Sequence, residues 1–216
     1  MRETGGRLEQ VGRVGGLGRG ERIYAARFIG EVGYLVTFRQ VDPLYTLDLR
    51  DPARPRVVGE LKITGYSAYL HPIGDDLLLG VGQEATTEGR RLGAQVSVFD
   101  VSDPARPARL HQRVLGTGSS SAEVDPHAFL WWPKEKLALL PYEEWDERWT
   151  KRGMLGLRAG RSEGLTEVGR ITHGPAWDEA AVQRAVIVGD RVLTVSDFGV
   201  AAHRIGALAP LGFLPF

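Results

Sequence analysis

The chain has 216 residues, in which 27 basic residues balance 27 acidic ones and no cysteine occurs. This length is enough to bury the core of one domain. The balanced charge argues against binding to nucleic acid or an anionic membrane. The absence of cysteine excludes disulfides, thiolate catalysis and cysteine-ligated zinc. No apolar run of about 18 residues occurs, so no membrane span is predicted, and residues 1–20 lack the apolar centre of a signal peptide.

A repeated octapeptide organises the sequence. Asp48–Pro55 reads DLRDPARP and Asp100–Pro107 reads DVSDPARP, at an offset of 52 residues. Asp followed by Pro favours a type I turn, and the second Pro cannot donate to a strand ladder. A repeat of this length with four short apolar runs is typical of a blade of a β-propeller. The predicted fold class is therefore all-β, a β-propeller.

In chain order, residues 1–7 are predicted to be disordered and residues 8–216 to form the propeller. Four blades of four strands are expected, at 22–64, 66–116, 127–172 and 183–214. Their inner strands are predicted at 23–29, 34–39 and 44–49; 68–73, 77–82 and 95–101; 128–132, 137–142 and 154–158; and 185–188, 192–196 and 200–205. Apolar runs such as LLLGV at 77–81 indicate strands that are buried on both faces between stacked sheets.

The outermost strand of each blade carries an aliphatic residue, Gly, any residue and a second aliphatic residue. The pattern occurs in Leu8–Val14, Val57–Leu61, Leu165–Ile171 and Leu208–Leu214, whereas Arg109–Leu115 has Gln112 in place of Gly. Gly inside a strand suits an edge position with a bulge.

Leu8–Val14 is then an extra outer strand without inner partners. Either it closes the ring on the last blade, or the chain is part of a larger ring, which we favour. The second reading exposes two blade faces and predicts self-association through open blade edges.

Function is expected on one rim of the propeller. In four-stranded meanders, the first–second and third–fourth turns share one rim, and here they are short and repetitive. The second–third and fourth–first connections share the other, which we name the loop rim; they fall at 39–43, 64–67, 83–93, 116–127, 143–153 and 172–183. Variable loops on a rigid scaffold are where binding sites gather.

Several polar residues are candidates for a site. Arg39, Gln40 and Asp42 cluster on one connection, where Arg39 either clamps an anionic ligand or forms a structural salt bridge with Asp42. His71 and His127, with Asp125, are expected near the central channel.

With His173 these residues could hold a divalent metal, although histidines without fixed spacing are more often structural. Asp125 could equally cap the turn before Pro126. Ser119–Ser121 suggests a hydrolase but lacks the G-x-S-x-G elbow.

Three tryptophans, Trp145, Trp149 and Trp177, are expected on the loop rim. Exposed aromatics there suit stacking on a sugar or a peptide. The spacing of Trp145 and Trp149 predicts one turn of a short helix, in which packing is the alternative role.

The segments TFRQVDPL at 37–44 and DPARP, together with GTGSSSAEVDPHAFLWW at 116–132, resemble a bacterial and archaeal family of secreted proteins with a C-terminal β-propeller domain. The resemblance covers roughly residues 8–205. It implies a propeller fold and an extracytoplasmic or cell-surface setting. The family's recognisable polar positions match Arg39, Gln40, Asp42, Tyr69, His71 and His127, without established catalytic roles. Its members are longer than this chain, with additional blades before this region and a signal or anchor segment, and this sequence departs from them by lacking that front half.

The sequence therefore predicts a non-catalytic binding scaffold that holds a protein, a small molecule or a carbohydrate on the loop rim. The predicted ligand-binding residues are Arg39, Gln40, Asp42, Tyr69, His71, Asp125 and His127. No cofactor is predicted. The alternative is a metal-assisted hydrolase or lyase that uses His71, Asp125 and His127 at the channel mouth.

Overall fold

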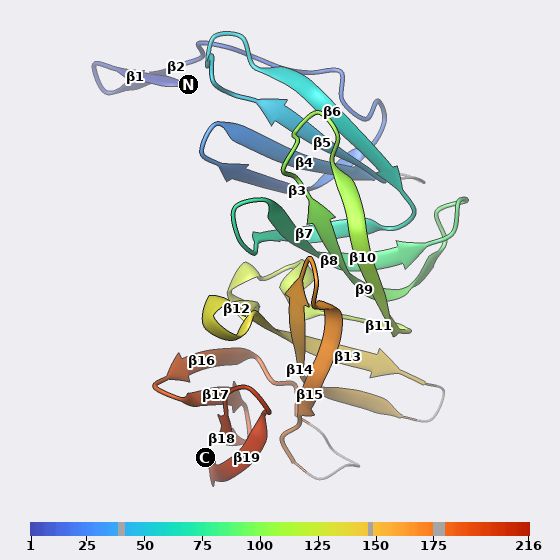
Figure 1. Ribbon diagram of the computed structural model, residues 1–216, viewed down its shortest axis with the longest axis vertical. Helices are drawn as coiled ribbons and strands as arrows, with labels where there is room; N and C mark the ends of the chain where they lie inside the picture. The colour runs from blue at the N-terminus through green and yellow to red at the C-terminus, as the bar shows by residue number, and fades with distance from the viewer. Residues whose placement is uncertain (39–41, 147–148, 175–179) are drawn as a thin grey trace.

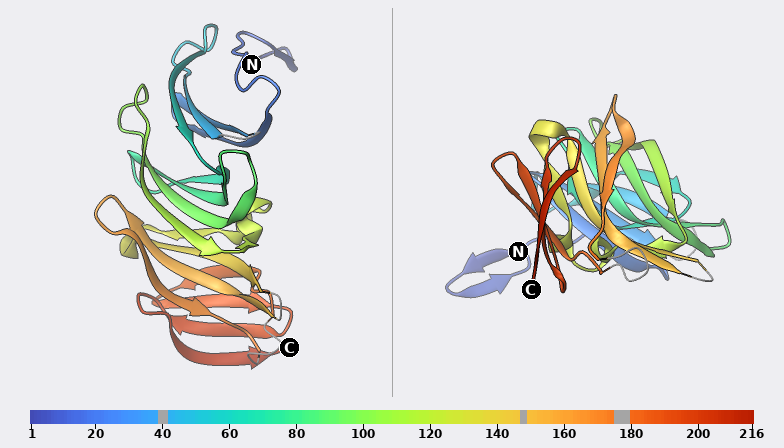
Figure 2. Two further views of the ribbon diagram at one scale, coloured as in Figure 1. Left: turned by 90° about the vertical axis from the view of Figure 1, so that its right-hand side faces the viewer. Right: turned by 90° about the horizontal axis from the view of Figure 1, so that it is seen from below.

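The structure, a computed structural model, describes residues 1–38, 42–146, 149–174 and 180–216. Within these ranges the regular structure is β-strand apart from three short 3-10 turns. Apart from a two-stranded hairpin near the N-terminus, the described strands form four antiparallel sheets that stack along a curved line, with the two termini at opposite ends of the stack (Figures 1 and 2). The prediction of an all-β propeller fold is confirmed.

Each sheet is a meander whose strands follow one another in chain order. The first blade contains β3 (Arg22–Ile29), β4 (Val32–Phe38), β5 (Asp42–Asp48) and β6 (Arg56–Ile63). The second contains β7 (Tyr66–Pro72), β8 (Leu77–Ala85), β9 (Arg91–Asp100) and β10 (Ala108–Gly116). The third contains β11 (Gly118–Ser119), β12 (Leu130–Trp132), β13 (Leu137–Trp145), β14 (Thr150–Gly160) and β15 (Gly164–Ile171). The fourth contains β16 (Arg184–Val188), β17 (Arg191–Ser196), β18 (Gly199–Arg204) and β19 (Ala209–Pro215).

Alternation along the inner strands assigns each side chain to one of three cores between blades. Leu78 belongs to the core between the first and second blades, and its neighbour Leu79 to the core between the second and third. Successive residues of a strand point to opposite faces, so both are fully buried. In β13, Leu139 enters the core shared with the fourth blade and Leu140 the core shared with the second. This geometry explains the continuous apolar runs of the sequence.

A β-bulge precedes the glycine position of every outer strand. The register shifts fall at Val58, Leu110, Val168 and Leu211, so the residues that follow the bulge are Gly59, His111, Gly169 and Gly212. A Cβ on Gly59 would overlap with the carbonyl oxygen of Pro104, in the third–fourth turn of the next blade. The glycine therefore allows an outer strand to approach the neighbouring turn.

The second blade corrects the predicted alignment of its outer strand. His111, and not Gln112, follows the bulge, and the His111 imidazole contacts the Arg161 carbonyl oxygen of the next blade's turn, with Nε2 at 2.9 Å. Gln112 instead donates within its own blade to the side chains of Glu84 and Gln95. In the second blade a side chain therefore reaches the neighbouring turn, whereas in the first blade glycine lets the turn approach the strand backbone.

The N-terminal region differs from two predictions. Residues 1–7 were expected to be disordered, but an exposed hairpin of β1 (Arg2–Thr4) and β2 (Arg7–Glu9) forms there around two glycines with positive φ. Only the first residues of Leu8–Val14 are strand, and they pair with β1 and not with a blade. Gly12 nevertheless lies against the carbonyls of Pro52 and Ala53, as Gly59 does against Pro104. The segment around Gly12 therefore lies where the outer strand of a preceding blade would lie, but it forms no hydrogen-bonded ladder with a blade.

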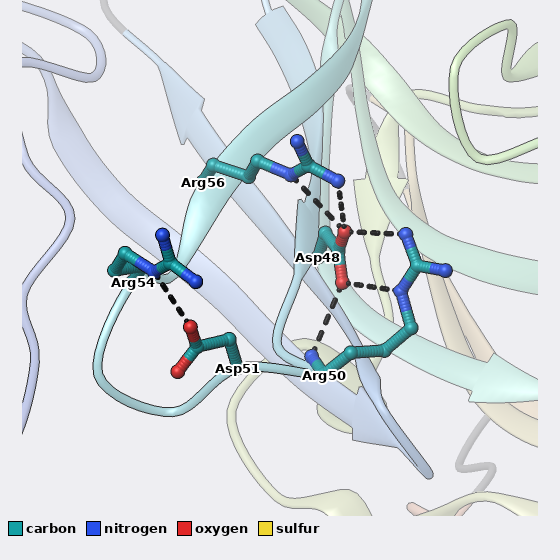
Figure 3. A network of polar contacts seen from close by, with 5 residues as sticks. All are labelled: Asp48, Arg50, Asp51, Arg54 and Arg56. Carbon is teal, nitrogen blue, oxygen red and sulfur yellow. Dashed lines mark hydrogen bonds and ion pairs between the residues drawn. The ribbon is translucent and has the colours of Figure 1, made fainter.

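The short-turn rim is fixed by charged side chains. In the first repeat, the Asp48 carboxylate accepts from Arg50 Nη2 at 2.7 Å and from Arg56 Nη2 at 2.9 Å (Figure 3). These two hydrogen bonds hold the pKa of Asp48 well below its usual range. In the second repeat, the matching Asp100 pairs instead with Arg161 of the third blade, at 2.5 Å. The aspartate of the repeated turn therefore forms its ion pairs within one blade in the first repeat and with the neighbouring blade in the second.

Candidate binding cleft on the loop rim

The innermost strand of the third blade is interrupted. β11 pairs with β13 at Glu143–Glu144, and β12 pairs with β13 at Leu137–Leu139. Residues 120–128 leave the sheet between these points and form two 3-10 turns, η1 (Ser121–Glu123) and η2 (Pro126–Ala128). The first strands of the other three blades are continuous. Since first strands line the axis of a propeller, this insertion places irregular chain on the inner surface.

The first turn of the insertion is built by a capping box. The Ser120 side chain accepts from the backbone, and Glu123 Oε1 accepts from the Ser120 N–H at 2.9 Å. The same oxygen accepts from Gln83 Nε2 of the second blade at 2.7 Å. Burial raises the pKa of Glu123, and its hydrogen bonds oppose the rise. Glu123 was not among the predicted residues, although the S-x-x-E pattern of a capping box is visible in the sequence.

The second turn is capped by Asp125, as the turn-capping alternative proposed. Its Oδ1 accepts from the His127 N–H at 3.0 Å, and Pro126 occupies the first position of the turn. Its Oδ2 pairs with Arg184 Nη2 of the fourth blade at 2.5 Å. The backbone N–H of His127 is the largest cause of the lowered pKa of Asp125. The His127 side chain is 88% exposed, so it is open to a partner.

A cavity of about 410 Å³ opens beside this insertion. Its walls come from the insertion, from β13 and β14, and from the chain leading into β16; the residues that line it include Ser121, Glu123, Glu143, Gln183 and Arg184. Ligand sites typically have volumes of about 300–1,000 Å³. The cavity lies between the third and fourth blades and is lined by residues of three of the predicted loop-rim connections, 116–127, 143–153 and 172–183.

Tyr69 and His71 meet at the other end of the insertion. The Tyr69 hydroxyl lies 2.9 Å from His71 Nδ1, and both rings contact Phe129, with centroids at 5.3 and 4.9 Å. Burial, assisted by the Arg27 charge, lowers the pKa of His71 to about 4. The imidazole is therefore neutral at pH 7. These two predicted residues form one aromatic cluster with the residue that follows η2.

The predicted cluster of Arg39, Gln40 and Asp42 is only partly described. Arg39 and Gln40 lie outside the described residues, as does Trp177. Asp42 begins β5 and pairs in register with Ile63. Whether Arg39 binds a ligand or forms a salt bridge stays a prediction.

The histidines do not form a metal centre in the part of the chain that the structure describes. No group of three His, Asp or Glu side chains there is arranged to hold an ion. His173 is buried, with Nδ1 at 2.7 Å from the Ser196 hydroxyl and Nε2 at 2.9 Å from the Thr194 hydroxyl. Burial lowers the pKa of His173. This histidine therefore has a structural role, as the alternative reading of the sequence proposed.

The serine run is also used structurally. The Ser120 hydroxyl is buried and donates to the Pro141 carbonyl oxygen at 2.5 Å, so it is engaged as a support of the insertion. Ser121 is exposed at the cavity wall. This arrangement offers hydrogen-bonding groups and not an activated nucleophile.

Two tryptophans, Trp145 and Trp149, lie on the hairpin formed by β13 and β14 and not on a helix. Trp145 ends β13 and pairs with Thr150 of β14, and the Asp146 N–H donates to the Trp149 carbonyl at 3.0 Å. The helical turn predicted from their spacing is wrong, because the two strands continue to the tip of a hairpin. Trp145 and Trp149 are 47% and 42% exposed. The same hairpin carries Glu143 and Gly153 of the cavity wall.

Four antiparallel meanders that stack side by side define the chain as a β-propeller. The profile of the family described as "Beta propeller domain" matches residues 4–208. The chain therefore belongs to this family.

Two archaeal proteins are similar to part of the chain. An uncharacterised protein of Methanocaldococcus jannaschii is 46% identical over 134 residues, and one of Archaeoglobus fulgidus is 45% identical over 135 residues. Each match covers 62% of this chain and 21% of the relative, so the chain matches about a fifth of the length of these relatives.

Among solved structures, the N-terminal domain of Nup159 is similar over 88% of this chain and 62% of its own, with 13% identity and a TM-score of 0.26.

No helix among the described residues is long and apolar enough to cross a membrane.

Proposed function

We propose that this propeller is a non-catalytic scaffold that binds a polar ligand in the cleft between its third and fourth blades. The interruption of the inner strand at residues 120–128 carries the proposal. The other blades have continuous first strands, so this insertion is a departure from the repeat. It borders the cavity with Glu123 and leads through Asp125 to the exposed His127.

The chemistry of the walls favours a hydroxyl-rich ligand. Glu123, Glu143 and Ser121 offer acceptors, and Arg184 offers donors. The exposed Trp145 and Trp149 add faces on which a sugar ring can stack. A carbohydrate, or a protein loop of similar polarity, fits this combination better than an apolar molecule. The resemblance to secreted propeller proteins supports an extracytoplasmic setting as part of the proposal.

Calorimetric titration with a panel of neutral and amino sugars tests the proposal. We expect at least one sugar to bind, and Ser121→Trp to abolish this binding because the indole fills the cavity. Ser162→Trp on the opposite rim is the matched control and is expected to bind normally. A panel without a binder, or binding that Ser121→Trp leaves intact, would contradict the carbohydrate assignment.

The predicted residues outside the cavity have their own test. Alanine substitutions at Arg39, His71 and His127 are expected to weaken binding of the sugar found in the panel. If all three variants bind with unchanged affinity, the prediction that these residues bind the ligand is wrong.

A further inference from the structure

One carboxylate of the cleft has no oppositely charged partner among the described residues. The charged side chains in the lining of the cavity are Glu123, Glu143 and Arg184. Arg184 is paired with Asp125 of η2 at 2.5 Å, and Glu143 is paired with Arg152 of β14 at 3.2 Å. These two ion pairs each cancel their charges. Glu123 therefore supplies the uncompensated negative charge of the wall.

Neutral amide groups hold the Glu123 carboxylate in place. Its Oε1 accepts from the Ser120 N–H at 2.9 Å and from Gln83 Nε2 at 2.7 Å. The Gln83 amide also donates to the Gly118 carbonyl oxygen at 3.3 Å, and the Gln83 carbonyl oxygen accepts from Gln95 Nε2 at 3.0 Å. These contacts fix the position of the carboxylate without neutralising its charge. A ligand therefore meets an acceptor that is already oriented.

The second oxygen of Glu123 is the one that a ligand can use. Both hydrogen bonds that the described residues make with this carboxylate use Oε1, and an ionised carboxylate accepts at either oxygen. Burial raises the pKa of Glu123, and the Arg91 charge is the weakest of the influences that oppose the rise. Removing a carboxylate from water is unfavourable unless a cation compensates the charge. A positively charged group of a ligand would provide this compensation.

We propose that the cleft is specific for an amino sugar, whose protonated amine pairs with Glu123 while its hydroxyl groups contact the polar walls. This inference rests on the proposed function and adds the charge of the ligand to it. Hydrogen bonds between charged groups are roughly twice as strong as those between neutral groups. A neutral sugar leaves the Glu123 charge uncompensated, and an anionic sugar is repelled by it. Glu123 is thus the residue that sets the specificity.

Calorimetric titration with matched ligands tests the proposal. Glucosamine carries the amine, whereas glucose and N-acetylglucosamine are neutral. At a pH between the pKa of Glu123 and that of the amine, we expect glucosamine to bind at least about tenfold more tightly than either neutral sugar. The amide of Nα-acetyl-lysine carries an ammonium group without a sugar ring. It should bind more weakly than glucosamine, because it lacks the hydroxyl groups that contact the walls.

Glu123→Gln removes the charge and keeps the local structure. Glutamine also serves as the third residue of a capping box, so its side-chain oxygen can accept from Ser120 and Gln83 as before. In this variant, glucosamine should bind about tenfold more weakly, with the affinity of glucose, and the binding of glucose should not change. Circular dichroism checks that the sheets are intact.

Glu144→Gln is the matched control. Glu144 lies on the same hairpin as Glu143, is paired with Arg170 at 3.3 Å, and is not part of the cavity lining. Its substitution removes the same charge from the same region of the surface. The preference for glucosamine should therefore remain.

The other outcomes separate this inference from the proposed function. If glucose binds as tightly as glucosamine, the sugar-binding cleft stands and the specificity for an amine is wrong. If no sugar binds, both proposals are wrong. If Glu143→Gln abolishes the preference and Glu123→Gln does not, the amine is bound by the other carboxylate. Binding of the lysine amide as tight as that of glucosamine would show that the cleft recognises an ammonium group alone, which overturns the assignment to an amino sugar.

Discussion

The second and fourth blades are built from the same four-stranded meander but differ in how many faces they bury. In the second blade, β8 is buried at almost every position, with Leu78 and Leu79 both fully enclosed. In the fourth blade, β17 alternates between buried residues such as Val192 and half-buried ones such as Leu193. When a blade packs on each face of a sheet, successive residues of its strands are all buried. When a blade packs on one face only, burial alternates along the strand. Burial is therefore a property of the position in the stack and not of the blade.

The largest effect should come from truncating a side chain enclosed on the two-sided blade. Leu79→Ala is expected to lower the free energy of unfolding by about 4 kcal/mol, through lost burial and a cavity between blades. Leu193→Ala, on the one-sided blade, should lower it by about 1 kcal/mol. Urea unfolding of the monomer at low concentration, followed by tryptophan fluorescence, measures both. Equal losses would show that the fourth blade is covered on both faces.

Valine substitutions at the equivalent glycines Gly59 and Gly212 should distinguish an outer strand that contacts a neighbouring turn from one that does not. Gly59→Val drives a branched side chain into the Pro104 carbonyl and is expected to destabilise the monomer by about 2–3 kcal/mol. Gly212→Val meets open space and should change the stability by less than about 0.5 kcal/mol. The same urea titrations measure the pair. A large loss of stability in Gly212→Val would contradict the open space beside this residue.

Acid should act on the interface of the second blade through His71. Its folded pKa of about 4 lies below the usual histidine pKa of about 6.5, so the unfolded chain binds the proton more readily. Stability is therefore full above pH 6.5 and falls between pH 6.5 and 4, by at most about 1.4 kcal/mol per pH unit before solvent screening. Unfolding free energies of His71→Gln, measured from pH 4 to 7, should lose part of the slope shown by the unsubstituted chain. Identical slopes in the variant and the unsubstituted chain would exclude His71 as a source.

The smallest effects should come from the two repeated turns. Asp100 is bound by Arg161 across two blades, whereas Asp48 is bound by Arg56 within one. Double-mutant cycles, with Asp→Asn and Arg→Gln at each pair, should give the larger coupling for the pair between blades, and high salt should reduce both. A larger coupling within the first blade would show that the bridge to the third blade adds nothing.

The local parts of the fold could be predicted from the sequence with few errors. Period-two alternation, hairpin glycines and the Asp-Pro turns act over a few residues, so they identify the strands. The outer strand of the second blade was misaligned because its residue after the bulge is His111 and not a glycine. Counting four residues from the second proline of each turn leads to Gly59 and to His111 alike, and would have avoided the error.

The candidate site was less predictable. Asp125 and His127 were identified because histidine and carboxylate stand close in sequence, His71 because it lies on a predicted first strand, and Tyr69 through the family resemblance. Glu123, Glu143 and Arg184 were missed, since they come together only when three elements of two blades meet around one cavity. A pattern of neighbouring residues in the sequence cannot indicate contacts between residues so far apart in the chain.

By itself, the sequence determined the repeat, the meander and the turn chemistry, because hydrogen-bonded strands and proline turns depend on neighbouring residues. Only the tertiary structure decided which face of each strand is buried, where the first strand of the third blade opens, and which aspartate bridges two blades. These features depend on the packing of one sheet on the next, in which residues far apart in the chain share a core.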